Sequence, residues 1–212
     1  MSLKTFGVVA LSCALFVSGQ QAKNRGIFTD DGPIGNAGTG GGVVFDPAKG
    51  EYKVSGAGAD VWGTSDDFHF VWKKLTGNMS LSADIRWEGT GGFPRRKAML
   101  MIRQSLDAGS PYVDGAFHGN GLNSLQFRGR AGEQTYQVLT QIDGPVHMRI
   151  ERVGTRYTVF AGKPGAQPAQ LGPVEFITLG DSVYVGLGVC SHVAGTVDSA
   201  FFSNVKIEQP TP

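Results

Sequence analysis

The side chains best suited to chemistry are one tryptophan, two histidines, one tyrosine and two arginines, all between residues 62 and 128. An aromatic ring can pack against the apolar face of a sugar, while imidazole, phenol and guanidinium groups hydrogen-bond to its hydroxyls. Together these types favour an oligo- or polysaccharide as partner. We predict that one concave face carries six ligand-binding residues: Trp62, His69, Arg103, Tyr112, His118 and Arg128.

The three tryptophans are expected to differ in exposure. Trp62 follows a run of small turn residues, so we expect it to be the most exposed. Trp72 follows Phe68 and Phe70 at a spacing of two, which places all three on one face of a strand. That pattern, and a similar one around Trp87, predicts that the other two tryptophans pack in the core.

Paired carboxylates for glycoside hydrolysis are hard to find. The reaction needs two of them about 5–10 Å apart, and the Glu-x-Asp-x-x-Glu strand of β-sandwich glucanases is absent. Asp84 and Glu88 come nearest, but Arg86 lies between them, which is typical of a solvated row of ion pairs. A polysaccharide lyase would instead use a Tyr or His base and an Arg or Lys neutraliser. Those types are present in Tyr112, His118, Arg103 and Arg128. The sequence leans against an enzyme and leaves a hydrolase or lyase as the alternative.

Metal ligands give a weaker signal than the sugar-binding types. The four histidines show no HExxH motif and no paired spacing, which argues against a histidine-based metal site. We therefore expect no cofactor, except for a structural calcium ion held by loop carboxylates and carbonyls. The candidate calcium ligands are Asp66, Asp67, Asp114 and Asp198.

The elements that must position these residues are short strands. Residues 79–87 alternate strictly between apolar and polar side chains, which predicts a strand with one buried face. Residues 98–102 are apolar throughout, which predicts a strand covered on both faces. About a dozen such runs occur at a spacing of roughly 8–12 residues, a pattern typical of all-β sandwiches. We therefore predict an all-β fold, a two-sheet antiparallel β-sandwich.

Composition narrows the possible partners and the number of domains. The 212 residues contain 19 basic and 18 acidic side chains. This balance gives no electrostatic reason to expect nucleic acid or an anionic membrane surface as partner. The 32 glycines are spread between apolar runs, as expected for turns between many strands. No linker divides the chain, so we predict one domain over residues 20–212.

The first 19 residues resemble a secretory signal peptide. A short region with one lysine precedes an apolar run, residues 6–17, and small residues before Gln20 suit cleavage. The run is shorter than the ~20 residues of a transmembrane helix. We therefore expect export to the periplasm or the outside of the cell, with no membrane span after signal removal.

Cleavage before Gln20 would remove Cys13 and leave Cys190 without a disulfide partner. A lipoprotein site at Cys13 fits less well, because Ala10-Leu11-Ser12 departs from a lipobox. Cys190 ends an apolar run, so we expect it to be a small buried hydrophobe.

The order of motifs resembles a known group of β-sandwiches. The sequence Asp67-Phe68-His69-Phe70-Val71-Trp72 is followed by the alternating strand and by residues 98–103. A His118-Gly119-x-Gly121 turn and a last strand, residues 200–205, complete the set. This order is similar to that of concanavalin A-like (laminin-G-like) jelly rolls, in particular the domain at the C-terminus of β-xylosidases. It is also similar to stand-alone exported bacterial relatives that accompany TolB-like propeller proteins.

The resemblance covers residues 26–208 and implies two sheets of about six or seven strands. It also implies that the concave face is where a glycan binds, and it carries over no catalytic activity. Our leading hypothesis is an exported, non-catalytic domain that binds carbohydrate. A glycan-active enzyme and a module that binds a protein of the cell envelope are the alternatives.

Overall fold

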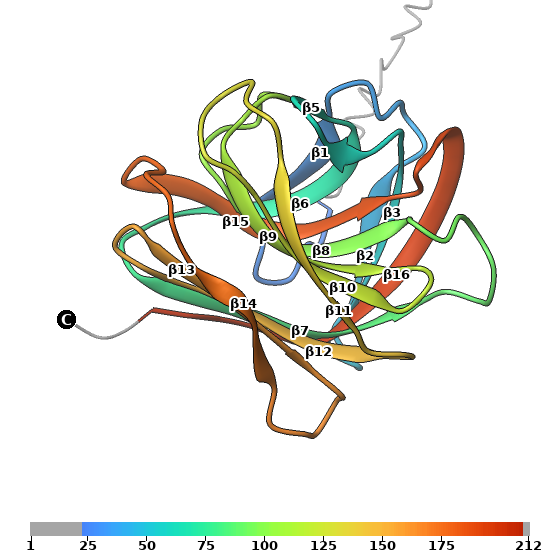
Figure 1. Cartoon of the computed structure of the whole chain (residues 1–212). Coiled ribbons are helices and arrows are strands. Elements are labelled where there is room, and N and C mark those ends of the chain that lie inside the picture. The colour runs from blue at the N-terminus through green and yellow to red at the C-terminus, as the bar shows by residue number, and fades with distance from the viewer. Residues whose placement is uncertain (1–22, 210–212) are drawn as a thin grey trace, which may run out of the picture.

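The structure, a computed structural model, describes residues 23–209. The predicted signal peptide lies outside the described residues, as do residues 20–22 and 210–212 of the predicted domain. Two antiparallel sheets of seven strands each pack face to face (Figure 1). The predicted two-sheet β-sandwich is therefore confirmed. Among the described residues there is no helix of a length and hydrophobicity that would cross a membrane.

The first sheet, called sheet A, contains the predicted central strand. Its order is β1 (Asp30–Ile34), β6 (Phe68–Thr76), β15 (Ser182–Cys190), β8 (Lys97–Arg103), β9 (Tyr112–His118), β10 (Leu122–Arg128) and β11 (Tyr136–Gln141). Strands β8 and β9 are buried along their whole length. Both faces of the middle of sheet A must therefore be covered.

The second sheet, called sheet B, packs against one face of sheet A. Its order is β14 (Ala169–Phe176), β13 (Arg156–Gly162), β12 (Val146–Val153), β7 (Met79–Trp87), β16 (Val193–Glu208), β3 (Glu51–Gly58) and β2 (Gly42–Asp46). The alternation predicted for β7 is confirmed, because its apolar side chains enter the core between the sheets. A short hairpin, β4 (Val61–Trp62) and β5 (Ser65–Asp66), belongs to neither sheet.

The outer face of sheet A, turned away from sheet B, carries a second apolar cluster. It includes Phe68 and Phe70 of β6, Met99 and Met101 of β8, and Val61 of the hairpin. Strand alternation separates this cluster from the core, since Val71 and Leu100 point the other way. The hairpin thus closes over the outer face of sheet A, and this explains why β8 is apolar on both faces.

Two glycines of β15 let aromatic rings lie across the outer face. A Cβ atom at Gly186 would lie 1.9 Å from the carbonyl oxygen of Val71, and one at Gly188 would lie 2.9 Å from the ring of Phe68. Both distances are shorter than any real contact, so side chains at these positions would force β6 and β15 apart. Trp72 stacks on Phe70 with ring centroids 5.7 Å apart, so it is half-buried on this outer face and not between the sheets.

Candidate functional site

The row of charges on the outer face of β7 consists of ion pairs with β12 and with β3, which lies beyond β16. This agrees with the sequence interpretation of Asp84, Arg86 and Glu88 and gives no catalytic pair. The pairs are Asp84–His147 (2.6 Å), Arg86–Glu51 (3.0 Å) and Glu88–Lys53 (2.6 Å).

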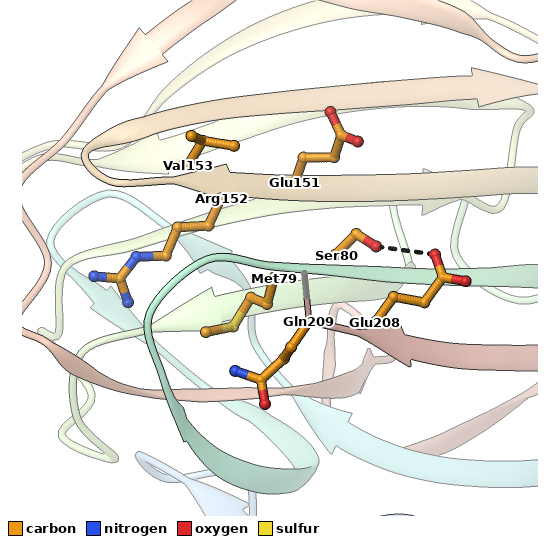
Figure 2. Close-up of a pocket in the computed structure, with 7 residues that line it drawn as sticks. All are labelled: Met79, Ser80, Glu151, Arg152, Val153, Glu208 and Gln209. Atoms are coloured by element: carbon orange, nitrogen blue, oxygen red, sulfur yellow. Dashed lines mark hydrogen bonds between the residues drawn. The ribbon is translucent and has the colours of Figure 1, made fainter. Parts of the chain in front are cut away.

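Two other carboxylates share a pocket at one end of sheet B. Figure 2 shows Glu151 of β12 and Glu208 of β16 on either side of Ser80, whose hydroxyl donates to Glu208 at 3.4 Å. Glu151 pairs with Arg149, and Glu208 is exposed. No aromatic ring lines this pocket. A sugar ring would find no stacking platform there, so the pocket fits glycan binding poorly.

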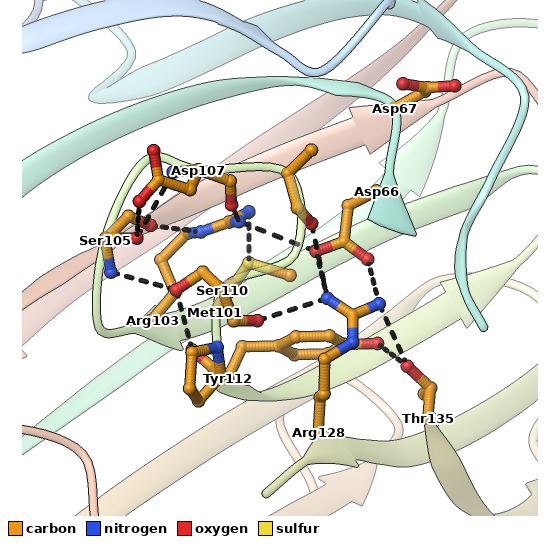
Figure 3. Close-up of polar contacts among 12 residues, drawn as sticks. Asp66, Asp67, Met101, Arg103, Ser105, Asp107, Ser110, Tyr112, Arg128 and Thr135 are labelled. Atoms are coloured by element: carbon orange, nitrogen blue, oxygen red, sulfur yellow. Dashed lines mark hydrogen bonds and ion pairs between the residues drawn. The ribbon is translucent and has the colours of Figure 1, made fainter. Parts of the chain in front are cut away.

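A buried cluster of charges holds the hairpin in place. Asp66, at the end of the hairpin, accepts hydrogen bonds from Arg128 at 2.7 and 2.9 Å and lies 3.5 Å from Arg103 (Figure 3). The hydroxyl of Tyr112 lies 3.2 Å from that of Thr135, which also contacts Arg128. We call these five residues the Asp66 cluster. All but Thr135 are completely buried, and Thr135 is 5% exposed.

The Asp66 carboxylate has two arginine partners, so the Asp66 cluster carries one more positive than negative charge. Burial raises the pKa of the Asp66 carboxyl, and the hydrogen bond from Arg128 and the charge of Arg103 oppose that rise. Burial lowers the pKa of Arg103 to about 10, so this side chain is still a cation at neutral pH. Arg128 also donates to the backbone carbonyls of Gly63 and Ser110, at 3.1 Å each. The guanidinium therefore joins the hairpin to a neighbouring loop.

Three of the six predicted ligand-binding residues, Arg103, Tyr112 and Arg128, belong to the Asp66 cluster. A ligand could reach them only if the hairpin moved, so we leave them out of the site proposed below. His69 lies on the opposite face of β6 from Phe68 and Phe70, and its Nε2 is 3.2 Å from a carboxylate oxygen of Asp31. Burial lowers the pKa of His69. The six residues therefore do not line one face, because side chains alternate along β6.

The other two predicted residues, Trp62 and His118, meet in a pocket of about 250 Å³ at the edge of the hairpin. We call it the Trp62 pocket. Its lining residues are Asp60, Trp62, Arg95, Lys97, His118, Gln137 and His192. The sequence analysis missed five of these. Lys97 alone gave a signal, since it is the polar first residue of β8 and shares a strand face with Arg103.

Asp60 is the only carboxylate that lines the Trp62 pocket in the described part of the chain. Lys97 donates to it at 2.7 Å and also to the carbonyl of Val61 at 2.7 Å. Nε2 of His192 lies 3.1 Å from the other carboxylate oxygen, and its ring stacks on Phe93. The ammonium of Lys97 lies 5.5 Å from the centre of the Trp62 ring, a cation–π contact. These contacts fix the tryptophan and leave it half-buried.

His118 adds a neutral imidazole to the pocket. Its Nε2 lies 3.1 Å from the hydroxyl of Ser124, and its buried Nδ1 has no hydrogen-bond partner. Burial, with the charges of Lys97 and Arg95, lowers the pKa of His118 to about 3. The ring is therefore uncharged at neutral pH.

A row of polar side chains crosses sheet A beside the pocket. Asp114, Gln126 and Gln137 are direct neighbours on β9, β10 and β11. Gln126 donates to the side-chain oxygen of Gln137 at 3.3 Å, but its own oxygen and both oxygens of Asp114 are buried without partners. Burial raises the pKa of Asp114 well above its ordinary value, which favours the neutral, protonated carboxyl. Buried polar groups usually have partners, so these atoms mark unused hydrogen-bonding capacity near the pocket.

The Trp62 pocket lies over the part of sheet A between His118 and the row formed by Asp114, Gln126 and Gln137. Gln137 and His118 both line it, and the cross-strand pair between their rows is Ala116 and Ser124. Short side chains at these two positions leave space above the sheet. The site thus combines an aromatic ring, a hollow and several hydrogen-bonding groups, which is the usual composition of a site for a polar ring.

The residues predicted for calcium have other partners or the wrong charge. Asp66 is held by arginines, Asp67 accepts from the backbone of Asn36 at 2.6 Å, and Asp198 pairs with Arg96 at 3.2 Å. Asp114 is neutral. No three His, Cys, Asp or Glu side chains gather as a metal site within residues 23–209. The structural calcium ion stays a prediction.

Comparison with known proteins shows the fold only. The sequence matches no known protein family and no curated protein. Among solved structures, the chain is similar to the carbohydrate-binding module CBM66 from Bacillus subtilis, with a TM-score of 0.56 and 15% identity, over 86% of this chain and 98% of that one. It is similar to a xylan β-1,4-xylosidase from Bacillus halodurans, with a TM-score of 0.53 and 13% identity, over 75% of this chain and 33% of that one. It is also similar to the family 7 alginate lyase A1-II′, with a TM-score of 0.50 and 8% identity, over 78% of this chain and 82% of that one. These similarities support the jelly-roll fold that the resemblance implied.

Proposed function

We propose that this protein is an exported, non-catalytic domain that binds a glycan in the Trp62 pocket. The observation that carries the proposal is a fixed, half-buried tryptophan in a pocket also lined by guanidinium, amide and imidazole side chains. Three structurally similar proteins are described as a carbohydrate-binding module, a xylosidase and a polysaccharide lyase. Their descriptions support a glycan as the ligand class.

Binding without turnover follows from the side chains of the pocket. Hydrolysis would need a second carboxylate beside Asp60, and Asp60 is already engaged by Lys97 and His192. The tyrosine and arginines suggested for a lyase lie in the buried Asp66 cluster. We therefore expect neither new reducing ends nor the ultraviolet absorbance of an unsaturated product when the protein is incubated with the glycans that it binds.

Replacing Trp62 by alanine should weaken glycan binding about tenfold, or about 1.4 kcal/mol, because the sugar loses its stacking surface. Isothermal titration with the oligosaccharides that raise the melting temperature of the wild type measures this effect. Phe176→Ala is the matched control, since Phe176 is an exposed aromatic residue on β14, 74% accessible, in the other sheet. Equal affinities for the wild type and the Trp62→Ala variant would remove this pocket from the proposal. Binding of an envelope protein, with no response to any glycan, would favour the interaction module.

The proposal of export rests on residues 1–19 and on the resemblance to exported TolB-associated proteins. Fractionation of the producing cell and the mass of the purified protein test it. A periplasmic or extracellular protein that begins at Gln20 is the expected result. Full-length protein found only in the cytoplasm would contradict export without affecting the assignment of the pocket.

A further inference from the structure

The Trp62 pocket has more positive than negative charge. Arg95 and Lys97 are basic side chains, and Asp60 is the single acidic side chain among the described residues that line the pocket. His192 shares that same carboxylate. Lys97 is buried and directed at Asp60 and at the carbonyl of Val61. Arg95 is exposed and makes no ion pair with any residue between 23 and 209. One cation of the pocket is therefore free.

The neighbouring polar groups do not cancel this charge. His118 is neutral, Asp114 is protonated, and Gln126 and Gln137 carry amides. A hollow walled by protein concentrates the field of its charges, so an anionic group entering it is favoured over a neutral one. Burial is the main cause of the low pKa of His118, and the charges of Lys97 and Arg95 lower it further.

The contacts of Asp60 show which group remains available to a ligand. Its carboxylate accepts hydrogen bonds from Lys97 and from the backbone N–H of Val61, the latter at 2.7 Å. It also lies beside His192. It therefore holds the hairpin and offers little to a sugar hydroxyl. The guanidinium of Arg95 has a planar set of donors that matches a carboxylate in two parallel hydrogen bonds.

We propose that the Trp62 pocket selects acidic saccharides, whose sugar carboxylate pairs with Arg95 while the ring lies against Trp62. Gln137 then bonds to a ring hydroxyl. The inference rests on the glycan-binding function proposed above and names the class of glycan that is bound.

Matched oligosaccharides that differ only in charge test the proposal. Oligogalacturonate and its methyl ester have the same backbone, and oligoalginate, hyaluronan fragments, xylo-oligosaccharides and cello-oligosaccharides complete the panel. We expect the full chain to bind at least one acidic member, at least tenfold more tightly than the ester or the neutral members at low salt. We also expect affinity for the acid to fall when salt is raised to 0.5 M, a concentration at which the screening length drops to about 4 Å.

Replacing Arg95 by glutamine should weaken binding of the acidic ligand about tenfold. Arg130→Gln is the control, since Arg130 is also an exposed arginine, 84% accessible, and does not line the pocket. Neutral sugars bound as tightly as acidic ones would overturn the inference and leave the glycan-binding function standing. Unchanged affinity of the Arg95→Gln variant for an acidic ligand would also overturn it. No response to any saccharide would overturn the proposed function itself.

Discussion

Replacing Arg128 by methionine is expected to lower the free energy of unfolding by about 3–5 kcal/mol, the usual cost of removing one partner from a buried ion pair. The variant leaves the Asp66 carboxylate, which is completely buried, with Arg103 as its only cationic partner, at 3.5 Å. It also removes donors from the carbonyls of Gly63 and Ser110. The hairpin that carries Trp62 should loosen, so glycan binding should weaken along with stability.

Urea unfolding of the wild type and the Arg128→Met variant measures this loss. Arg130→Met is the control, because its pair with Glu133 is exposed and such pairs contribute about 0–1 kcal/mol. A single variant as stable as the wild type would show that the hairpin does not depend on the Asp66 cluster.

Replacing Asp114 by asparagine is expected to make the protein more stable at neutral and basic pH. Burial raises the pKa of Asp114 in the folded protein, whereas in the unfolded chain it is about 3.9. A group with a raised folded pKa contributes its full stability below the unfolded pKa and loses it as the pH rises toward the folded pKa. The wild type should therefore lose about 1.4 kcal/mol per pH unit across that interval relative to the variant.

The difference between the two unfolding free energies, measured from pH 3 upward, isolates this effect from all other titrating groups. We expect the two proteins to agree near pH 3 and to diverge steadily above about pH 4. Asp143→Asn is the control, since Asp143 is an exposed aspartate in the loop after β11. A difference that does not change with pH would mean that Asp114 is ionised in the folded protein.

Strand alternation was the part of the structure that the sequence predicted best. The apolar alternation of β7 and the continuous apolar run of β8 predicted a β-sandwich in which β8 is buried on both faces, as the structure shows. The same alternation places His69 opposite Phe68 and Phe70. Grouping His69 with the other candidate ligand-binding residues on one face therefore contradicted the alternation of side chains along β6.

The candidate site was predicted only in part, because its residues meet through long-range folding. Trp62 and His118 were identified from their side-chain types. Asp60, Lys97 and His192 join them through contacts between distant segments, which no local pattern reveals. Arg103 and Arg128 have the side chains of a binding site, but the sequence does not show that Asp66 folds back between them. An arginine in a strand can bind a ligand or anchor a loop, and only the position of the counter-charge distinguishes the two.

The last two described strands in chain order lie inside the sheets. β15 separates β6 from β8, and β16 separates β7 from β3. While the ribosome still holds residues 182–208, each sheet therefore exists only as unconnected halves with open strand edges. Neither sheet can be completed before residues 182–208 are available, and folding, dominated by pairings between distant segments, proceeds slowly. A chain truncated before residue 193 could not join β3 to β7.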